Sequence, residues 1–238
     1  MPPTADPLAA LGVPIDLSVS PRASRLTLRV DGATGRVRVT VPPGVGREQA
    51  DAFAARHAGW IRRRLEAIPE RVPFAVGTEI PVLGVPHRIR QDATTRAPAR
   101  LARGEDGPEI MVGRTEFPER RVLGLLKAEA ERELAARTRE KAARIGRRVA
   151  SVAVQDTRSQ WGRCSASGHI RYSWRLILAP EGILDYLVAH EVAHLEHMDH
   201  SRRFWRLCAS LSAVPAERAR AWLRRHGQAL HRYGPPDR

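Results

Sequence analysis

The sequence predicts an α+β protein in which a small β-rich module with one helix precedes a mainly helical domain. Alternating apolar and polar residues recur in the first half of the chain, whereas apolar residues at helical spacing dominate the second half. With 238 residues, the chain is long enough for one large or two modest domains with hydrophobic cores. We therefore expect a β-rich module over residues 21–115 and a second domain over residues 116–238.

Residues 1–20 are rich in proline and alanine, and we expect them to form a short disordered lead-in. Asp6 and Asp16 lie where a secretory signal would have a basic start and an apolar run. No segment approaches the roughly 18 consecutive apolar residues that a membrane span requires. These observations predict a cytoplasmic protein that does not associate with membranes.

The β-rich module is expected to begin with a hairpin over residues 25–41, where apolar and charged residues alternate on both sides of Asp31-Gly32. Apolar residues at helical spacing over residues 47–68 predict one helix, which stops before Pro69. The rest of the module is expected to contain three short strands, over residues 80–83, 86–90 and 109–112. Residues 96–106, between the second and third of these strands, are expected to form a loop or hairpin tip.

The second domain is expected to start with a long charged helix over residues 118–146, because strong helix formers occur throughout. Strands at 149–155 and 169–178 are expected to pair antiparallel across a loop that contains two glycines. Three helices should follow, and this order of helix, hairpin and helices is typical of an α+β domain. Their expected ranges are about 181–197, 201–211 and 215–230.

The chain is strongly basic, with 40 Lys and Arg against 26 Asp and Glu and a net charge of +14. Such a surplus favours acidic partners, and nucleic acid in particular. Half of it lies in residues 201–238, so a nucleic-acid contact through this basic surface stays an alternative to a generally solvated surface. The two cysteines, Cys164 and Cys208, form no CxxC pair, which argues against a disulfide scaffold and a cysteine-based zinc site.

Residues 190–194 form an HExxH motif within a strongly apolar stretch. His190 and His194 are four residues apart, so on a helix they share a face and can converge on one ion. Glu191 projects beside that ion, where it can hold and deprotonate a water molecule. Burying these polar side chains without partners would be costly, and a metal removes that cost. We therefore expect a Zn²⁺ site in which Glu191 is the catalytic general base.

A catalytic zinc needs a third protein ligand, and His197 and His200 are the candidates. His197 lies further along the same helix, in line with the first two ligands, whereas a tetrahedral site needs ligands from different directions. His200 follows Asp199, a residue type that readily ends helices and forms turns, so the chain can turn back there. We expect His200 to complete the site, at the spacing of the metzincin pattern HExxHxxGxxH. Asp199 could also accept a hydrogen bond from a ligand imidazole.

Two segments resemble a known family: DTRSQWGRCSASGHIRYSWRLILAP over residues 156–180 and LDYLVAHEVAHLEHMDHSRRFW over residues 184–205. They are similar to the YgjP-like zincin metallopeptidases, relatives of the SprT and WLM proteases. The resemblance implies a zincin-like catalytic domain, a zinc cofactor and His200 as third ligand. Arg163, Ser173 and Asp199 depart from the family pattern. The residues that match it are Arg158, Trp161, Gly162, Cys164, Ser165, His190, Glu191, His194, His200, Ser201, Phe204 and Trp205.

In zincins, a strand beside the active-site helix often binds an extended substrate at the sheet edge, and the strand over residues 169–178 is the candidate here. Arg158, Trp161 and Tyr172 are candidate substrate-binding residues, although Arg158 and Trp161 could instead brace the site. Tyr172 or His169 could stabilise the developing oxyanion.

The favoured function is that of a zinc-dependent metallopeptidase that acts on peptides or proteins. Three alternatives remain open. The same site could hydrolyse a nucleotide phosphoanhydride, with arginines holding the phosphates. It could belong to a protease that acts on DNA-bound proteins, or to a non-catalytic, metal-stabilised module that binds DNA or RNA.

Overall fold

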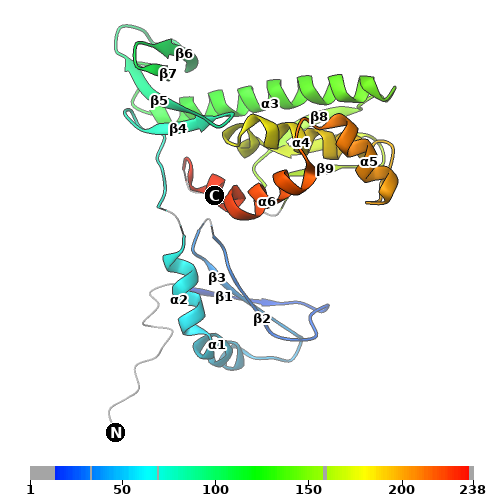
Figure 1. The fold of residues 1–238 in the computed structure, drawn as a ribbon. Coiled ribbons are helices and arrows are strands. Elements are labelled where there is room, and N and C mark those ends of the chain that lie inside the picture. Colours follow the sequence, from blue (N-terminus) through cyan, green and yellow to red (C-terminus); the bar gives the residue numbers. More distant parts are fainter. Residues whose placement is uncertain (1–13, 33, 69, 158–159, 236–238) are drawn as a thin grey trace. The chain divides into compact units, whose positions relative to one another are not determined.

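The computed structural model divides into two compact units and describes four stretches of the chain: residues 14–32, 34–68, 70–157 and 160–235. The first unit extends to Glu70, and the second runs from Arg71 to Pro235. Both units contain helices and strands (Figure 1), which confirms the predicted α+β class. Within the described stretches, no helix is long and apolar enough to cross a lipid bilayer.

The first unit is a three-stranded sheet with two short helices, α1 (Arg47–Arg56) and α2 (Ala58–Glu66). Its strands pair in the order β1-β3-β2, and β2 and β3 form the predicted antiparallel pair. Every second residue of β3 is a fully buried valine, and these valines share a small core with α1 and α2. The strands are β1 (Ile15–Val19), β2 (Thr27–Val30) and β3 (Val37–Val41).

Two expectations for this region differ from the structure. The single helix expected over residues 47–68 is interrupted at His57, whose backbone angles (φ −107°, ψ 12°) leave the helical range. The lead-in expected over residues 1–20 contains β1, because Ile-Asp-Leu-Ser-Val alternates apolar and polar side chains with the period of a strand. Residues 1–13 of that lead-in lie outside the described residues.

The second unit begins with a four-stranded sheet of order β4-β5-β7-β6. The loop expected over residues 96–106 therefore contains a strand. That strand, β6, lies at the edge of the sheet and pairs only with β7, and its exposed polar residues resemble a loop in composition. The strands are β4 (Glu79–Val82), β5 (Val85–Asp92), β6 (Arg100–Gly104) and β7 (Gly107–Gly113).

This sheet packs with the helical part of the chain, although the predicted boundary at 115/116 assigned residues 71–115 to the N-terminal module. In the turn between β4 and β5, a Cβ on Gly84 would lie 2.8 Å from the Cα of Pro180. The neighbouring Leu83 donates its N–H to the carbonyl of Ile177 at 2.6 Å. Buried side chains of the sheet also continue into the main core. The compact units therefore divide near residue 70.

The rest of the second unit consists of a long helix, a small sheet and three further helices, with two 3₁₀ helices between and after them (Figure 1). The long helix is α3 (Pro118–Arg144), and the sheet contains β8 (Ser151–Gln155), β9 (Gly162–Cys164) and β10 (His169–Ser173). The remaining elements are η2 (Trp174–Leu178), α4 (Glu181–Ala193), α5 (Arg202–Leu211), α6 (Ala216–His226) and η3 (Gly227–Arg232).

The small sheet has the order β8-β10-β9 and corrects two predictions. β8 and β10 are parallel, not antiparallel, because the segment between them forms a third strand, β9, which makes the antiparallel hairpin with β10. The strand expected over residues 169–178 ends at Ser173, and the next five residues form η2. Consequently β10 is the central strand, and β9 lies at an edge.

α4 is the central helix of the second unit, and almost all of its side chains from Ile183 onward are buried. It packs against α3, α5, α6 and β9. A buried ion pair joins α3 to α4, with the Nζ of Lys141 2.7 Å from the Oδ1 of Asp185. Because α4 is enclosed on all sides, its C-terminal end presents side chains in fixed positions.

Candidate metal centre

The HExxH motif lies at the C-terminal end of α4, and His190 and His194 project from successive turns of this helix. The Nδ1 of His194 lies 3.0 Å from the carbonyl oxygen of His197. A carbonyl only accepts hydrogen bonds, so Nδ1 carries the proton and Nε2 keeps its lone pair. His197 thus contributes its backbone to the orientation of His194, and its side chain is not part of the cluster.

The chain turns after His194 and brings His200 back to the helix end. Asp199 stabilises this turn, because its Oδ1 accepts the N–H of Ser201 at 3.2 Å. Ser201 then caps α5 by accepting the N–H of Phe204. The Asp199 side chain therefore acts as a turn residue.

The structure brings together the three histidines that the sequence predicts. One ring nitrogen from each of His190, His194 and His200 lies within 4.8 Å of the others. The Nε2 atoms of His190 and His200 are 3.3 Å apart. Two ligands of a tetrahedral zinc with bonds of about 2.0–2.1 Å are separated by about 3.3 Å, so this spacing fits a shared ion.

The surroundings of the cluster also fit a metal. Burial, followed by the charges of His194 and His200, lowers the pKa of His190 from 6.5 to about 4. The imidazole is therefore neutral at pH 7, the form that binds a metal. Phe204 packs against all three rings, with ring centroids 4.6–5.0 Å apart.

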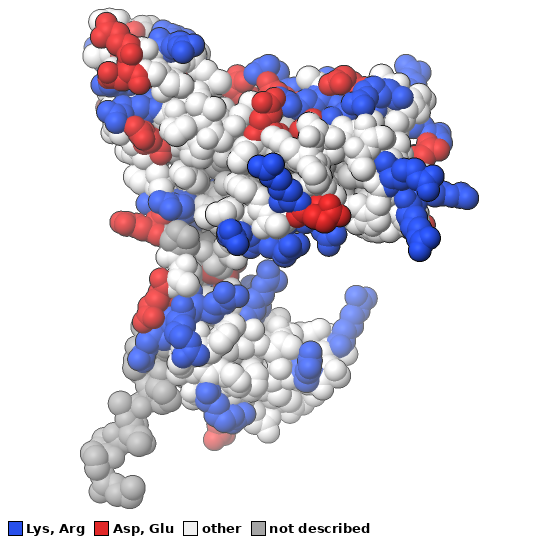
Figure 2. All heavy atoms as spheres, viewed as in Figure 1, with Lys and Arg blue, Asp and Glu red and all other residues white. Residues whose placement is uncertain are grey.

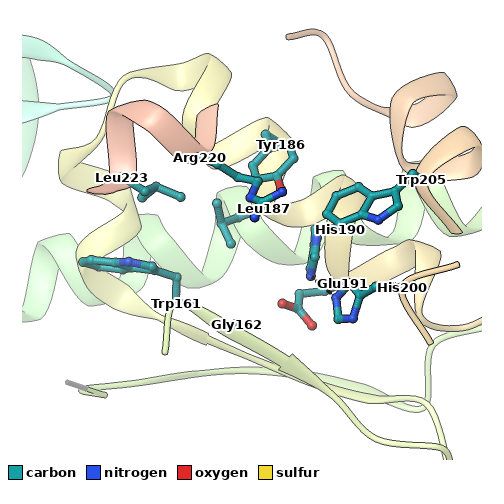
Figure 3. Close-up of a pocket in the computed structure, with 10 residues that line it drawn as sticks. All are labelled: Trp161, Gly162, Tyr186, Leu187, His190, Glu191, His200, Trp205, Arg220 and Leu223. Atoms are coloured by element: carbon teal, nitrogen blue, oxygen red, sulfur yellow. Dashed lines mark hydrogen bonds between the residues drawn. The ribbon is translucent and has the colours of Figure 1, made fainter. Parts of the chain in front are cut away.

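Glu191 lies beside the cluster with its carboxyl group against β9 (Figure 3). The side chain is buried, and burial raises its pKa from 4.5 to about 8, although a hydrogen bond from the backbone N–H of Cys164 opposes this shift. A Cβ on Gly162 would lie 2.5 Å from the Oε1 of Glu191, so a larger residue there would displace the carboxyl group. The Trp-Gly motif thus makes room for Glu191, a role that sequence reasoning did not assign to Gly162.

A pocket of about 520 Å³ opens over these residues (Figure 3). Sequence reasoning identified six of its residues and missed four, two on α4 and two on α6: Tyr186, Leu187, Arg220 and Leu223. The helical spacing of Arg220 and Leu223, three residues apart, is the signal that could have grouped them on one face. The complete lining is Trp161, Gly162, Tyr186, Leu187, His190, Glu191, His200, Trp205, Arg220 and Leu223.

The candidate substrate-binding residues differ in their positions. Trp161 lines the pocket and packs against the ring of His231 with centroids 5.5 Å apart, so it can both contact a ligand and brace the wall. Tyr172 does not reach the pocket: it is 1% exposed and its hydroxyl lies 3.0 Å from the Oγ1 of Thr138. Tyr172 is therefore a core residue and not the substrate-binding residue that the sequence suggested. Arg158 lies outside the described residues.

Two further expectations change with the sheet topology. His169 does not line the pocket, and its Nδ1 lies 2.8 Å from the Oγ of Ser151. β10 cannot offer a free edge to a substrate, because it is paired on both sides. The edge strand beside Glu191 is β9.

The comparison with protein families decides the assignment. The model of the YgjP-like metallopeptidase domain matches residues 24–226. The chain belongs to the YgjP-like family. The match confirms the resemblance, covers most of both compact units, and includes the histidine cluster, Glu191 and Gly162. No curated protein and no solved structure gives a match. A YgjP-like metallopeptidase domain implies a metal cofactor, and the three imidazoles are the residues suited to hold it.

Proposed function

We propose that this protein is a zinc-dependent metallopeptidase that hydrolyses peptide bonds, with Glu191 as the general base. The main support for the proposal is that three imidazole rings converge on one point. A buried carboxyl group lies beside them in the same pocket. His190, His194 and His200 would hold the ion. Three neutral histidines are a common ligand set for catalytic zinc, which supports zinc over harder cations such as Mg²⁺.

His190, His194 and His200 would hold a Zn²⁺ that, when bound, would act as a Lewis acid on the scissile carbonyl and make a water molecule more acidic. The Oε atoms of Glu191 take a proton from that water and then return it to the leaving amine. Gly162 and the N–H of Cys164 hold the carboxyl group in place, and the carbonyl of His197 orients His194. Burial raises the pKa of Glu191, and a cation bound beside it would lower that pKa again, which would give the carboxylate form that a general base needs.

The proposed substrate is an extended peptide that pairs with the free edge of β9, in place of the strand expected from the sequence. This edge strand lies directly beside Glu191, so a segment paired with it would pass the reacting groups. Recognition through backbone groups makes few demands on the substrate sequence. Specificity must then come from the pocket side chains.

The test compares purified variants on a set of fluorogenic peptides, with zinc content measured on the same samples. Glu191→Gln should retain one zinc per chain and lose activity about 100-fold or more, because general base catalysis contributes that much. His194→Ala should lose both metal and activity. Glu196→Gln is the matched control, because this exposed residue pairs with Arg147 and does not line the pocket. A fully active Glu191→Gln protein would show the general-base assignment to be wrong.

The same samples test the alternatives. Turnover of a nucleoside triphosphate that depends on Glu191 would replace the peptidase proposal with nucleotide hydrolysis. Cleavage of a protein only in the presence of DNA, with salt-sensitive DNA binding, would indicate a DNA-associated protease. Zinc binding without any turnover, and DNA or RNA binding unchanged in Glu191→Gln, would indicate a non-catalytic module. On the face seen in Figure 2, basic side chains are interspersed with acidic ones on the second unit.

A further inference from the structure

One cationic side chain, Arg220, faces the pocket that holds the histidine cluster. It projects from α6, and in Figure 3 it extends alongside Tyr186. The pocket lining contains no lysine and no second arginine. The single carboxyl group in the lining is Glu191, which is 4% exposed and held against β9. Arg220 is therefore the fixed positive charge that a bound substrate meets.

The exposed side chain of Arg220 contacts an aromatic ring and has no acidic partner among the described residues. Its Cζ lies 5.4 Å from the centroid of the Trp205 ring, a cation–π contact that restrains the side chain. Among the described residues, no carboxylate lies within ion-pair distance of it, including Glu217 one turn earlier on α6. Other arginines of the unit, such as Arg137 and Arg147, are paired with glutamates. A cation–π contact uses none of the N–H donors of the guanidinium group, so these can bind a ligand.

Arg220 also lies where the pocket continues into a second hollow. That hollow, about 590 Å³, is formed by the end of α5, the α5–α6 connection and the start of α6. Trp205 and Arg220 line both hollows, and most other residues of the second are small or apolar. A peptide that extends from the reacting groups toward the α5–α6 connection would pass this arginine.

We propose that Arg220 binds a carboxylate of the substrate close to the scissile bond. The inference rests on the peptidase function proposed above. A planar guanidinium presents parallel N–H donors that match the two oxygens of a carboxylate. One arginine with aromatic and apolar neighbours suits a single negative charge, whereas a polyphosphate needs several donors or cations. The carboxylate is either an acidic side chain next to the cleaved bond or the C-terminus of the peptide.

The experiment uses matched quenched peptides that differ only in Glu or Gln at each position flanking the cleaved bond. A second pair carries a free or an amidated C-terminus, which separates the two sources of the carboxylate. Zinc-loaded wild-type protein should prefer one acidic peptide over its neutral match about tenfold to a hundredfold in kcat/KM. Arg220→Gln should bring this ratio close to one. Arg224→Gln, an exposed arginine on the same helix outside the pocket, should keep the wild-type ratio.

A binding measurement separates failure of this inference from failure of the peptidase proposal. Fluorescence anisotropy gives the Kd of the same labelled peptides for zinc-loaded Glu191→Gln protein, with and without Arg220→Gln. If wild type cleaves no peptide but binding shows an Arg220-dependent preference for the acidic peptide, carboxylate recognition stands without the peptidase function. Equal cleavage of both peptides, or a ratio that survives in Arg220→Gln, overturns the role of Arg220. Arg220-dependent binding that is tighter for a nucleoside triphosphate than for any acidic peptide also overturns it.

Discussion

At the scale of single residues, the candidate site depends on contacts that fix a carboxyl group. Glu191 lies between the histidine cluster and β9, where Gly162 leaves it just enough room. The backbone of Gly162 is not in the left-handed region, so the chain conformation does not require a glycine there. Glycine is required because the carboxyl group of Glu191 lies so close to its Cα. Gly162 therefore helps to position Glu191, the proposed general base.

Gly162→Ala should therefore lower peptidase activity about 100-fold or more while zinc content stays at the wild-type level, because a Cβ would displace Glu191 and leave the histidines in place. Activity and zinc measured on one preparation check this outcome. Gly124→Ala is the control, because a Cβ at Gly124 meets no atom within 4 Å. Wild-type activity in Gly162→Ala would mean that the carboxyl group tolerates displacement.

The raised pKa of Glu191 also makes a prediction about stability. A carboxyl group whose pKa rises from 4.5 unfolded to about 8 folded binds its proton more tightly in the folded state. This tighter proton binding contributes fully to the free energy of unfolding below pH 4.5, and the contribution is lost as the pH rises through 8. In metal-free protein between pH 6.5 and 7.5, the free energy of unfolding should fall by about 1 kcal/mol more in wild type than in Glu191→Gln.

Urea unfolding in the presence of a chelator measures this difference. His190, whose pKa is 6.5 in the reference state and about 4 in the folded state, also affects stability at the lower end of this interval, but it does so in both proteins and cancels from their difference. The difference between the two proteins thus reports Glu191 alone. Parallel pH profiles of wild type and Glu191→Gln would contradict the burial of a protonated carboxyl group.

At the scale of elements, one buried ion pair ties the pocket helices together. The Nζ of Lys141 on α3 lies 2.7 Å from the Oδ1 of Asp185 on α4 and donates to the carbonyl of Leu211 at the end of α5. The Oδ2 of Asp185 accepts the N–H of Ala213 at 2.8 Å. These contacts fix the connection between α5, which carries Trp205, and α6, which carries Arg220.

Lys141→Met should lower the free energy of unfolding by about 3–5 kcal/mol, because Asp185 would remain buried without its cation. The double variant Lys141→Met/Asp185→Leu should recover part of this loss, since it removes the charge as well. The other lysine, Lys127, is exposed, so Lys127→Met should change stability by about 0.5 kcal/mol or less. Urea unfolding checks all three. A Lys141→Met protein as stable as wild type would show that the pair contributes little.

Element prediction from the sequence succeeded where the local pattern determines the structure. The β2–β3 hairpin, α3 and the helix carrying HExxH follow from turn residues and from apolar periodicity. The pairing of β8 with β10 could not be predicted, because the three-residue strand β9 between them is too short to show a pattern. The same limit hid the edge position of β9 and the burial of Tyr172, both set by tertiary packing.

Site prediction shows the same division. His190, Glu191 and His194 follow from helical spacing, and the approach of His200 follows from the turn at Asp199. Three further pocket residues, Trp205, Arg220 and Leu223, come from α5 and α6, whose packing against α4 has no local signal. Arg220 in particular looks like any exposed arginine of a basic helix until the fold sets it beside the pocket.

At the scale of the whole molecule, all of the candidate site belongs to the second compact unit. That unit includes the sheet β4–β7, whose Ile80, Ile89 and Ile110 are fully buried in the main core. The first unit has a separate small core. The sequence-based boundary at residue 116 would cut through the main core, whereas a boundary near residue 70 leaves both cores intact.

A fragment of residues 71–238 should therefore fold cooperatively and bind one zinc per chain, and a fragment of residues 116–238 should not. The shorter fragment loses the buried isoleucines of β4, β5 and β7 and the hydrogen bond from Leu83 to Ile177, and burying one such side chain contributes about 1.5–3 kcal/mol. These losses exceed the typical stability of a domain, about 5–15 kcal/mol, once the other buried residues of the sheet are included. Thermal unfolding and zinc content, measured on both fragments, decide between the two boundaries. Cooperative unfolding of the fragment of residues 116–238 would support the domain boundary at residue 116 instead.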